Sequence, residues 1–296
     1  MRAFSIQSVL VPYAFSERCK ASAEYAVLIA ERLEIPIVFF HSIPYSSFEY
    51  AAFEGGAYVG ASWPTDADVH KRLAHEIEGL EMSDALRSRM SIKVTQGDPP
   101  QHIEAMARSL PDALVVMATH GFGRFRRLVL GSVVNKVLHD LDLPVLTGAH
   151  LEETAPGRPE PFESVVCAID LEEHSGEVLH WASEFAKRWG ARLTVVHAVD
   201  WLASSPLDEE RFTPGLRDRL MEDSRSKGEE LLAAVGVEAS LLVDLGSPEE
   251  VVSHAVQRFD AGLLIIGRTA DHDGLPALRE KAYSLVRRSP CPVISV

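Results

Sequence analysis

The residues whose types and spacing could bind a ligand form one segment near the middle of the chain. Ala118-Thr119-His120-Gly121 is separated by nine residues from Gly131-Ser132. Glycine lets the backbone approach a ligand without a Cβ clash, and a helix opening at Gly131-Ser132 would offer free N–H groups and its positive end to an anion. The Ser132 hydroxyl could donate to a phosphate oxygen or cap the helix. The pattern indicates a phosphate site, with a plain glycine turn and a serine cap as the alternative.

No arrangement typical of a catalytic or metal centre accompanies this segment. The chain lacks the phosphate-binding loop Gly-x4-Gly-Lys-Ser/Thr and the nucleophile elbow Gly-x-Ser-x-Gly. Gly121-Phe122-Gly123 lacks the third glycine of a dinucleotide-binding motif. Asp271-His272-Asp273 has metal-binding residue types, but three consecutive loop residues rarely all reach one ion. We therefore expect no catalytic residues and no metal ligands.

The hydrophobic pattern predicts the scaffold that positions these residues. In the first half, short apolar runs alternate with stretches of helical periodicity. The expected strands are residues 9–12, 35–40, 92–95, 113–118 and 145–147, and the expected helices are residues 17–33, 67–89 and 132–141. This alternation is typical of an α/β fold with a doubly wound parallel sheet. Ligands of such sheets bind at the carboxyl ends of the strands.

The second half of the chain repeats the first. Ser8-Val9-Leu10-Val11 recurs 156 residues later as Ser164-Val165-Val166-Cys167, and this offset holds without insertion as far as His41 and His197. Between the copies, residues 150–163 are rich in proline and acids, as in an extended linker. We therefore expect two domains of one fold, residues 1–149 and 164–296, joined by a linker over 150–163. We interpret His41 and His197, which end equivalent strands, as hydrogen-bonded structural histidines.

Composition and charge restrict the partners and the compartment. The 296 residues, enough for two domains, carry 29 Lys and Arg against 43 Asp and Glu, a net charge of −14. That charge argues against binding to nucleic acid or to an anionic membrane surface. No apolar run approaches the ~18 residues that span a bilayer. Three cysteines without a C-x-x-C pair fit a reducing compartment. We reject a signal peptide for the first apolar stretch because the same stretch recurs in mid-chain, and we expect a cytoplasmic protein.

Two further segments point to a family. Val11-Pro12-Tyr13-Ala14-Phe15-Ser16 ends the first expected strand, and a Pro-Val pair opens the last strand of each half, at Pro144 and Pro292. Together with the glycine segment, these motifs resemble those of the universal stress proteins, over nearly the whole chain and twice. The resemblance implies two tandem five-stranded Rossmann-like domains related by a pseudo-twofold axis. It also implies that domains pair, either within one chain or in a homodimer.

The resemblance further implies a nucleotide site, as in the ATP-binding branch of the family. The ends of the first and second strands would hold adenine and ribose, and the glycine motif would hold ribose and phosphates. The residues carried over are Pro12, Tyr13, Ala14 and Ser42 for the former, and Met117, Ala118, Thr119, His120, Gly121, Gly131, Ser132 and Val133 for the latter.

Departures from the family pattern bear on the affinity and on which half binds. The family usually has Asp at the position of Ala14, and a lost charged hydrogen bond costs roughly 1.5–3 kcal/mol, or about tenfold to a hundredfold in affinity. The second half keeps the carboxylate as Asp170 but has Arg279-Glu280 where the first has Gly131-Ser132. Glu280 would repel a phosphate. We therefore expect ATP, or an analogue, in the first half alone.

The resemblance implies a stress-response protein that binds an adenine nucleotide and acts through its conformation or a protein partner, and we expect no dedicated reaction. A nucleotide-free interaction protein is the alternative, which the loss of the carboxylate at Ala14 favours. A slow ATPase is a third interpretation, although no residue is assigned as its base. The aromatic segment Ser42–Pro64, which has no counterpart of this length in the second half, could cover the site or bind a partner.

Overall fold

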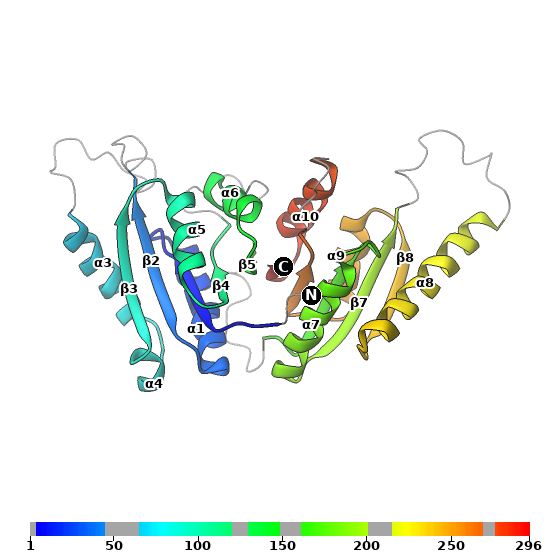
Figure 1. The fold of residues 1–296 in the computed structure, drawn as a ribbon, viewed down its shortest axis with the longest axis horizontal. Helices are drawn as coiled ribbons and strands as arrows, with labels where there is room; N and C mark the ends of the chain where they lie inside the picture. Colours follow the sequence, from blue (N-terminus) through cyan, green and yellow to red (C-terminus); the bar gives the residue numbers. More distant parts are fainter. Residues whose placement is uncertain (1–3, 45–64, 120–129, 149–160, 201–214, 269–275) are drawn as a thin grey trace. The chain divides into compact units, whose positions relative to one another are not determined.

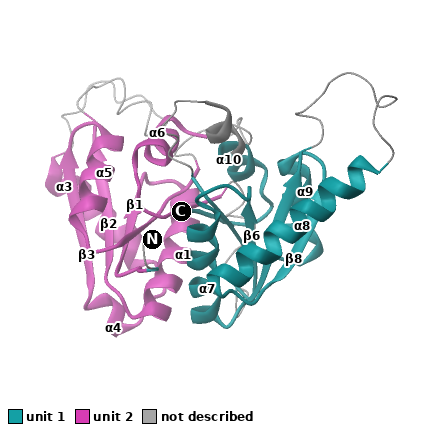
Figure 2. Ribbon diagram, turned by 45° about the vertical axis from the view of Figure 1, so that its right-hand side comes forward, with its two compact units in different colours: residues 1–4, 159–296 teal, residues 5–158 magenta. Residues whose placement is uncertain are grey.

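The structure is a computed structural model that describes residues 4–44, 65–119, 130–148, 161–200, 215–268 and 276–296. It divides into two compact units, which Figure 2 shows in different colours. The N-terminal unit is Ser5–Arg158, and the C-terminal unit is Pro159–Val296 together with Met1–Phe4. Each unit is a sheet of parallel strands with helices packed against it (Figure 1), so the predicted α/β fold is confirmed.

In the N-terminal unit, the described strands have the order β3-β2-β1-β4-β5. They are β1 (Ser8–Pro12), β2 (Ile37–Ile43), β3 (Met90–Gln96), β4 (Ala113–Val116) and β5 (Val145–Thr147). The helices are α1 (Glu17–Leu33), α3 (Asp66–Glu78), α4 (Asp84–Arg87), α5 (Pro99–Ser109) and α6 (Ser132–Asp140). The chain runs outward from β1 to β3 and then returns to β4 on the other side of β1. The carboxyl ends of β1 and β4 therefore flank the switch point where such sheets bind ligands.

The C-terminal unit repeats this topology with the strand order β10-β9-β6-β7-β8. Its strands are β6 (Ser164–Ile169), β7 (Arg192–Val199), β8 (Ser240–Leu245), β9 (Leu263–Ile266) and β10 (Val293–Ser295). The helices are α7 (Ser175–Trp189), α8 (Leu216–Val235), α9 (Pro248–Arg258) and α10 (Pro276–Arg288).

The duplication extends to the backbone. Val9 pairs with Ile37 across β1 and β2, and Val165 pairs with Leu193 across β6 and β7, so the strand register is the same at an offset of 156 residues. Phe15 and Leu171, which are related by the same offset, both have a positive φ, of 54° and 64°. Residues other than glycine rarely adopt this region. The two strand-to-helix turns therefore share one unusual backbone conformation.

The central strands form the cores. Every residue of β1, β2, β4 and β9 is buried, whereas the outer strands β3 and β8 are only partly covered. Strands buried on both faces have near-continuous apolar sequences, which explains why the apolar runs predicted them. Each fully buried aliphatic side chain contributes about 1.5–3 kcal/mol. Among the described residues, no helix combines the length and the apolar character that crossing a membrane requires.

The single helix predicted over residues 67–89 is wrong. The structure has two helices there, α3 and α4, separated by residues 79–83. Thr65 starts α3 with a reciprocal capping box to Asp68, and Ser83 starts α4 by accepting a hydrogen bond from the Leu86 amide. The Glu31 carboxylate accepts a hydrogen bond from the Ser83 amide at 2.6 Å, which ties this break to α1. Helix α3 ends at its C-cap residue Gly79, and the Glu31 contact lies at the start of α4.

Candidate ligand site

The two ends of the glycine segment meet at the carboxyl end of β4. The Gly131 amide donates a hydrogen bond to the Thr119 carbonyl oxygen at 2.9 Å. Met117, Ala118 and Thr119, which continue β4, are all buried. The structure therefore brings Met117, Ala118 and Thr119 together with Gly131, Ser132 and Val133. His120 and Gly121 lie outside the described residues.

Among the described residues, no side chain caps the start of α6. Gly131 is the N-cap residue, in an extended conformation (φ −61°, ψ 151°) and with no side chain to cap the helix. The first helical hydrogen bond runs from the Asn135 amide to the Gly131 carbonyl, so the amides of residues 132–134 have no acceptor within the helix. The first turn contains no acidic side chain. The alternative in which Ser132 caps the helix is wrong, because Ser132 is the first helical residue and is exposed.

The end of β1 lies beside the end of β4, since Leu10 pairs with Val115. Pro12 and Tyr13 are buried here, and the Tyr13 amide donates to the Phe40 carbonyl at 2.8 Å. The Tyr13 hydroxyl donates to Glu76 Oε2 on α3 at 3.2 Å. Burial, with a further contribution from the Glu76 charge, raises the pKa of Tyr13 well above its usual value. The phenol is thus a neutral, internally bonded group.

Ser42 also has an internal partner. Its hydroxyl donates to the Gly97 carbonyl at 3.1 Å, and the Gly97 amide donates to the Ile43 carbonyl at 2.8 Å. Ser42 is buried near the end of β2, which neighbours β1. The structure therefore places Pro12, Tyr13, Ala14 and Ser42 along adjoining strand ends, but the two hydroxyl groups among them already donate to the protein.

Ala14 and its counterpart Asp170 lie in the turns that precede equivalent helices, and these turns are bonded differently. Asp170 Oδ1 accepts hydrogen bonds from the Glu172 amide at 3.0 Å and from the Ser175 hydroxyl at 2.7 Å. In the first copy Cys19 replaces Ser175, and its sulfur accepts from the Ala14 amide at 3.3 Å. There Ser16 caps α1 through the Cys19 amide. The carboxylate of the second copy therefore holds the turn before α7 to Ser175, whereas the first copy forms its turn without a carboxylate.

The two histidines are structural, as predicted. His41 Nδ1 lies 2.7 Å from the Tyr13 carbonyl oxygen, and His197 Nδ1 lies 3.0 Å from the equivalent Ile169 carbonyl oxygen. These bonds hold the first strand of each unit to the second strand near their carboxyl ends. Burial lowers the pKa of His197, because the charged imidazolium is disfavoured away from water.

The sequence match to a known family decides the identity of this scaffold. The model of the universal stress protein family matches residues 5–147 and, a second time, residues 161–296. The chain belongs to the universal stress protein family. Its two copies are tandem Usp domains, which confirms the resemblance. We call them the first and the second Usp domain.

Individual relatives agree with this assignment. A universal stress protein of Thermus aquaticus is 31% identical over 137 residues, which are 46% of this chain and 98% of that protein. One of Mycobacterium tuberculosis is 29% identical over 155 residues, 52% of this chain and about half (47%) of that protein. The crystal structure of a universal stress protein from Archaeoglobus fulgidus has a TM-score of 0.66 at 20% identity, covering 99% of this chain and 98% of that chain. The last likeness shows a shared fold.

The second Usp domain differs at the helix that matches α6. The two helices end at equivalent positions, Asp140 and Arg288, but α10 begins at Pro276, four residues before Glu280. Glu280 is the counterpart of Ser132. It therefore lies inside α10, where a backbone amide bonds to the carbonyl four residues earlier. The open amides of the first domain have no equivalent at this position of the second.

The sequence reasoning missed two contributions from α3 to the strand ends. Arg72 lies over the ring of Phe15, 4.2 Å from its centroid, and Glu76 accepts the Tyr13 hydrogen bond. The Phe15 ring also packs against that of His41 at 4.9 Å. Arg72 and Glu76 are four residues apart and so share one face of the helix, a spacing that could have indicated a common neighbour.

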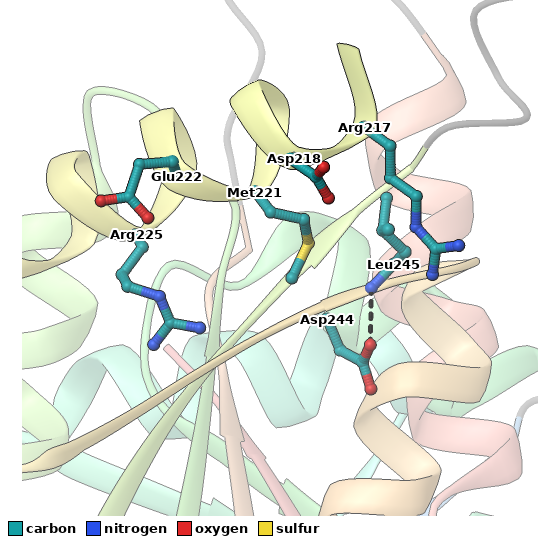
Figure 3. Close-up of a pocket in the computed structure, with 7 residues that line it drawn as sticks. All are labelled: Arg217, Asp218, Met221, Glu222, Arg225, Asp244 and Leu245. Atoms are coloured by element: carbon teal, nitrogen blue, oxygen red, sulfur yellow. Dashed lines mark hydrogen bonds between the residues drawn. The ribbon is translucent and has the colours of Figure 1, made fainter. Parts of the chain in front are cut away.

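A hollow of about 480 Å³ lies elsewhere, between α8 and the end of β8 in the second Usp domain (Figure 3). It is lined by Arg217, Asp218, Met221, Glu222, Arg225, Asp244 and Leu245. Asp244 Oδ1 accepts a hydrogen bond from the Leu245 amide at 2.8 Å. The lining mixes both charges on a largely exposed surface, and it shares no residue with the predicted nucleotide site.

Proposed function

We propose that this universal stress protein acts in the stress response as a nucleotide-binding protein of the cytoplasm. The first Usp domain binds one adenine nucleotide, ATP or an analogue, at the carboxyl ends of β1 and β4. The protein catalyses no dedicated reaction and acts through its conformation, a protein partner or a homodimer. The observation that carries the proposal is the start of α6, where the amides of residues 132–134 have no helical acceptor and no acidic neighbour in the first turn.

The phosphates would bind at this helix start. Gly131 contributes no side chain, Ser132 is exposed and can donate its hydroxyl, and the bond from Gly131 to Thr119 holds the helix start against the end of β4. Negative charge at a helix N-terminus gains from the helix dipole.

The second Usp domain supports this assignment by contrast. Because α10 begins at Pro276, the amide of Glu280 is used within the helix. Asp170, the carboxylate that the family would direct at the nucleotide, accepts two hydrogen bonds from its own helix start. We therefore propose one nucleotide per chain.

Recognition of the base and ribose would be weak in this protein. Ala14 offers no carboxylate, and the Tyr13 and Ser42 hydroxyl groups donate to Glu76 and to Gly97. Contacts there would come from backbone groups and apolar surface. Relative to a family member with the carboxylate, affinity would be about tenfold to a hundredfold lower.

A thermal-shift series tests the proposal. ATP, inorganic triphosphate and adenosine are compared at equal concentration. A ligand present at about 100 times its Kd adds about 2.7 kcal/mol of stability, or roughly 5–10 °C in Tm for a domain of this size. We expect ATP to give the largest shift, triphosphate a smaller one and adenosine the smallest. Equal Tm values with and without all three ligands would refute nucleotide binding.

A nucleotide-free interaction protein is the second candidate. It is favoured by the internal hydrogen bonds of Tyr13 and Ser42 and by the replacement of the Asp170–Ser175 pair with Ala14 and Cys19. Acid release from freshly purified protein separates the two candidates. Absorbance at 260 nm in the released fraction supports the nucleotide-binding function, and its absence together with a flat thermal-shift series supports the interaction protein.

A further inference from the structure

Helix α7 of the second Usp domain carries a stripe of aromatic side chains. Trp181, Phe185 and Trp189 are spaced four residues apart and therefore lie on one face. Phe185 stacks on Trp189 with ring centroids 4.2 Å apart and on Trp181 at 5.6 Å. We call these three residues the α7 aromatic stripe.

Two phenylalanines from outside the helix pack against the α7 aromatic stripe. Phe162, which precedes β6, lies 5.7 Å from Phe185 and 5.7 Å from Trp189 by ring centroids, and it is 1% exposed. Phe4 lies 5.0 Å from Trp181 and is 9% exposed. Phe162 is close to α7 in sequence, whereas Phe4 lies near the N-terminus of the chain, far from α7 in sequence.

Phe4 is held by more than apolar contact. The Arg188 guanidinium lies 5.0 Å from the centroid of the Phe4 ring, within the range of a cation–π interaction. Trp181, which the Phe4 ring touches, is only 7% exposed. The division of the chain into compact units also places Met1–Phe4 with Pro159–Val296, while Ser5 begins the other unit.

The first Usp domain lacks such a stripe. At an offset of 156 residues, Tyr25, Ile29 and Leu33 of α1 take the places of Trp181, Phe185 and Trp189. The arginine is present in both copies, as Arg32 and Arg188. A run of three aromatic residues at these positions is therefore found in the second domain alone, which is the domain that receives Phe4.

We propose that the α7 aromatic stripe is an anchoring site for the N-terminal segment of the same chain, with Phe4 as the anchor. The second Usp domain is then completed by a residue more than a hundred positions before its own first strand. Its helix α7 loses cover over Trp181 when the Phe4 ring is removed. This inference does not depend on nucleotide binding.

Tryptophan fluorescence tests the proposal. The chain has four tryptophans, and replacing Trp63 and Trp201 by Phe leaves Trp181 and Trp189 as the fluorescent pair. In that background, Phe4→Ala is expected to raise the acrylamide quenching constant by about twofold as Trp181 becomes exposed, and to lower the Tm by several degrees. Phe4→Leu keeps apolar bulk, so its quenching constant is expected to lie between those of the Phe4 protein and Phe4→Ala. This variant also keeps the test usable if Phe4→Ala does not fold.

Ile6→Ala is the matched control. Ile6 is 7% exposed and lies two residues further along, in the N-terminal unit. Its truncation is expected to lower stability without changing the quenching of Trp181 and Trp189. The proposal is overturned if Phe4→Ala leaves quenching unchanged, or if Ile6→Ala raises it equally. It is also overturned if the protection of Trp181 in the unmodified chain falls on dilution, because the anchor would then come from another copy.

Discussion

Asp170 offers a test of how the two Usp domains have diverged at the start of their first helices. Asp170→Ala removes the acceptor for the Glu172 amide and for the Ser175 hydroxyl. Losing the hydrogen bond to the Glu172 amide, which lies in the turn before α7, costs about 1 kcal/mol. Ser175 is 2% exposed, so its hydroxyl would lose its partner in a buried place, which costs about 1–3 kcal/mol more. We expect a total loss of about 2–4 kcal/mol.

Urea denaturation followed by far-UV circular dichroism measures this loss. The double variant Asp170→Ala/Ser175→Ala completes a mutant cycle, in which groups that share a hydrogen bond show an interaction energy of about 0.5–3 kcal/mol. The matched variant Ala14→Asp in the first domain is expected to gain little, because Ser16 already caps α1. A midpoint unchanged by Asp170→Ala, or fully additive effects of the two substitutions, would refute the reasoning.

Three further predictions concern Tyr13, His197 and Gly262. Because the pKa of Tyr13 is raised in the folded protein, its contribution to the free energy of unfolding is complete below pH ~10 and is lost as the pH rises above that value. Urea midpoints should therefore fall less between pH 8 and pH 11 in Tyr13→Phe than in the unmodified protein. Because the pKa of His197 is lowered in the folded protein, the unfolded chain binds the extra proton first, and stability falls as the pH drops below ~6.5. The urea midpoint at low pH should therefore fall less in His197→Gln than in the unmodified protein. Gly262→Ala would drive a Cβ into the Pro161 carbonyl group and should cost about 1–3 kcal/mol or more. Gly176→Ala, whose nearest contact would be an ordinary 3.5 Å, should leave the Tm nearly unchanged, and equal Tm values for the two alanine variants would contradict that account.

Much of the fold follows from local sequence. The fully apolar runs at β1 and β4 predict buried parallel strands because both faces of such strands are covered. The repeat offset predicts the shared strand register and the equivalent bonds of His41 and His197. Both inferences use sequence patterns that occur in each copy of the repeat, so each copy supports the other.

Features that depend on distant contacts were not predictable in this way. The hydrogen bond that ties the start of α4 to Glu31 comes from a residue far away in sequence. The sequence pattern aligns Gly131-Ser132 with Arg279-Glu280, but it does not reveal that α10 begins four residues before Glu280. The position of Phe4 against Trp181 likewise follows from no local periodicity. In each case a tertiary contact or a helix start decides what the side chains can do.

The central claim is that a phosphate group binds the open amides at the start of α6. Isothermal titration with ATP tests it most directly in Gly131→Asp and Gly131→Asn, since an N-cap Asp or Asn stabilises a helix at least as well as Gly. The backbone of Gly131 (φ −61°, ψ 151°) suits any L residue. We predict one ATP per chain, a Kd at least about tenfold weaker for Gly131→Asp because its carboxylate repels phosphate, and a smaller loss for Gly131→Asn, with Tm preserved in both. Unchanged ATP affinity in a folded Gly131→Asp protein would contradict the account.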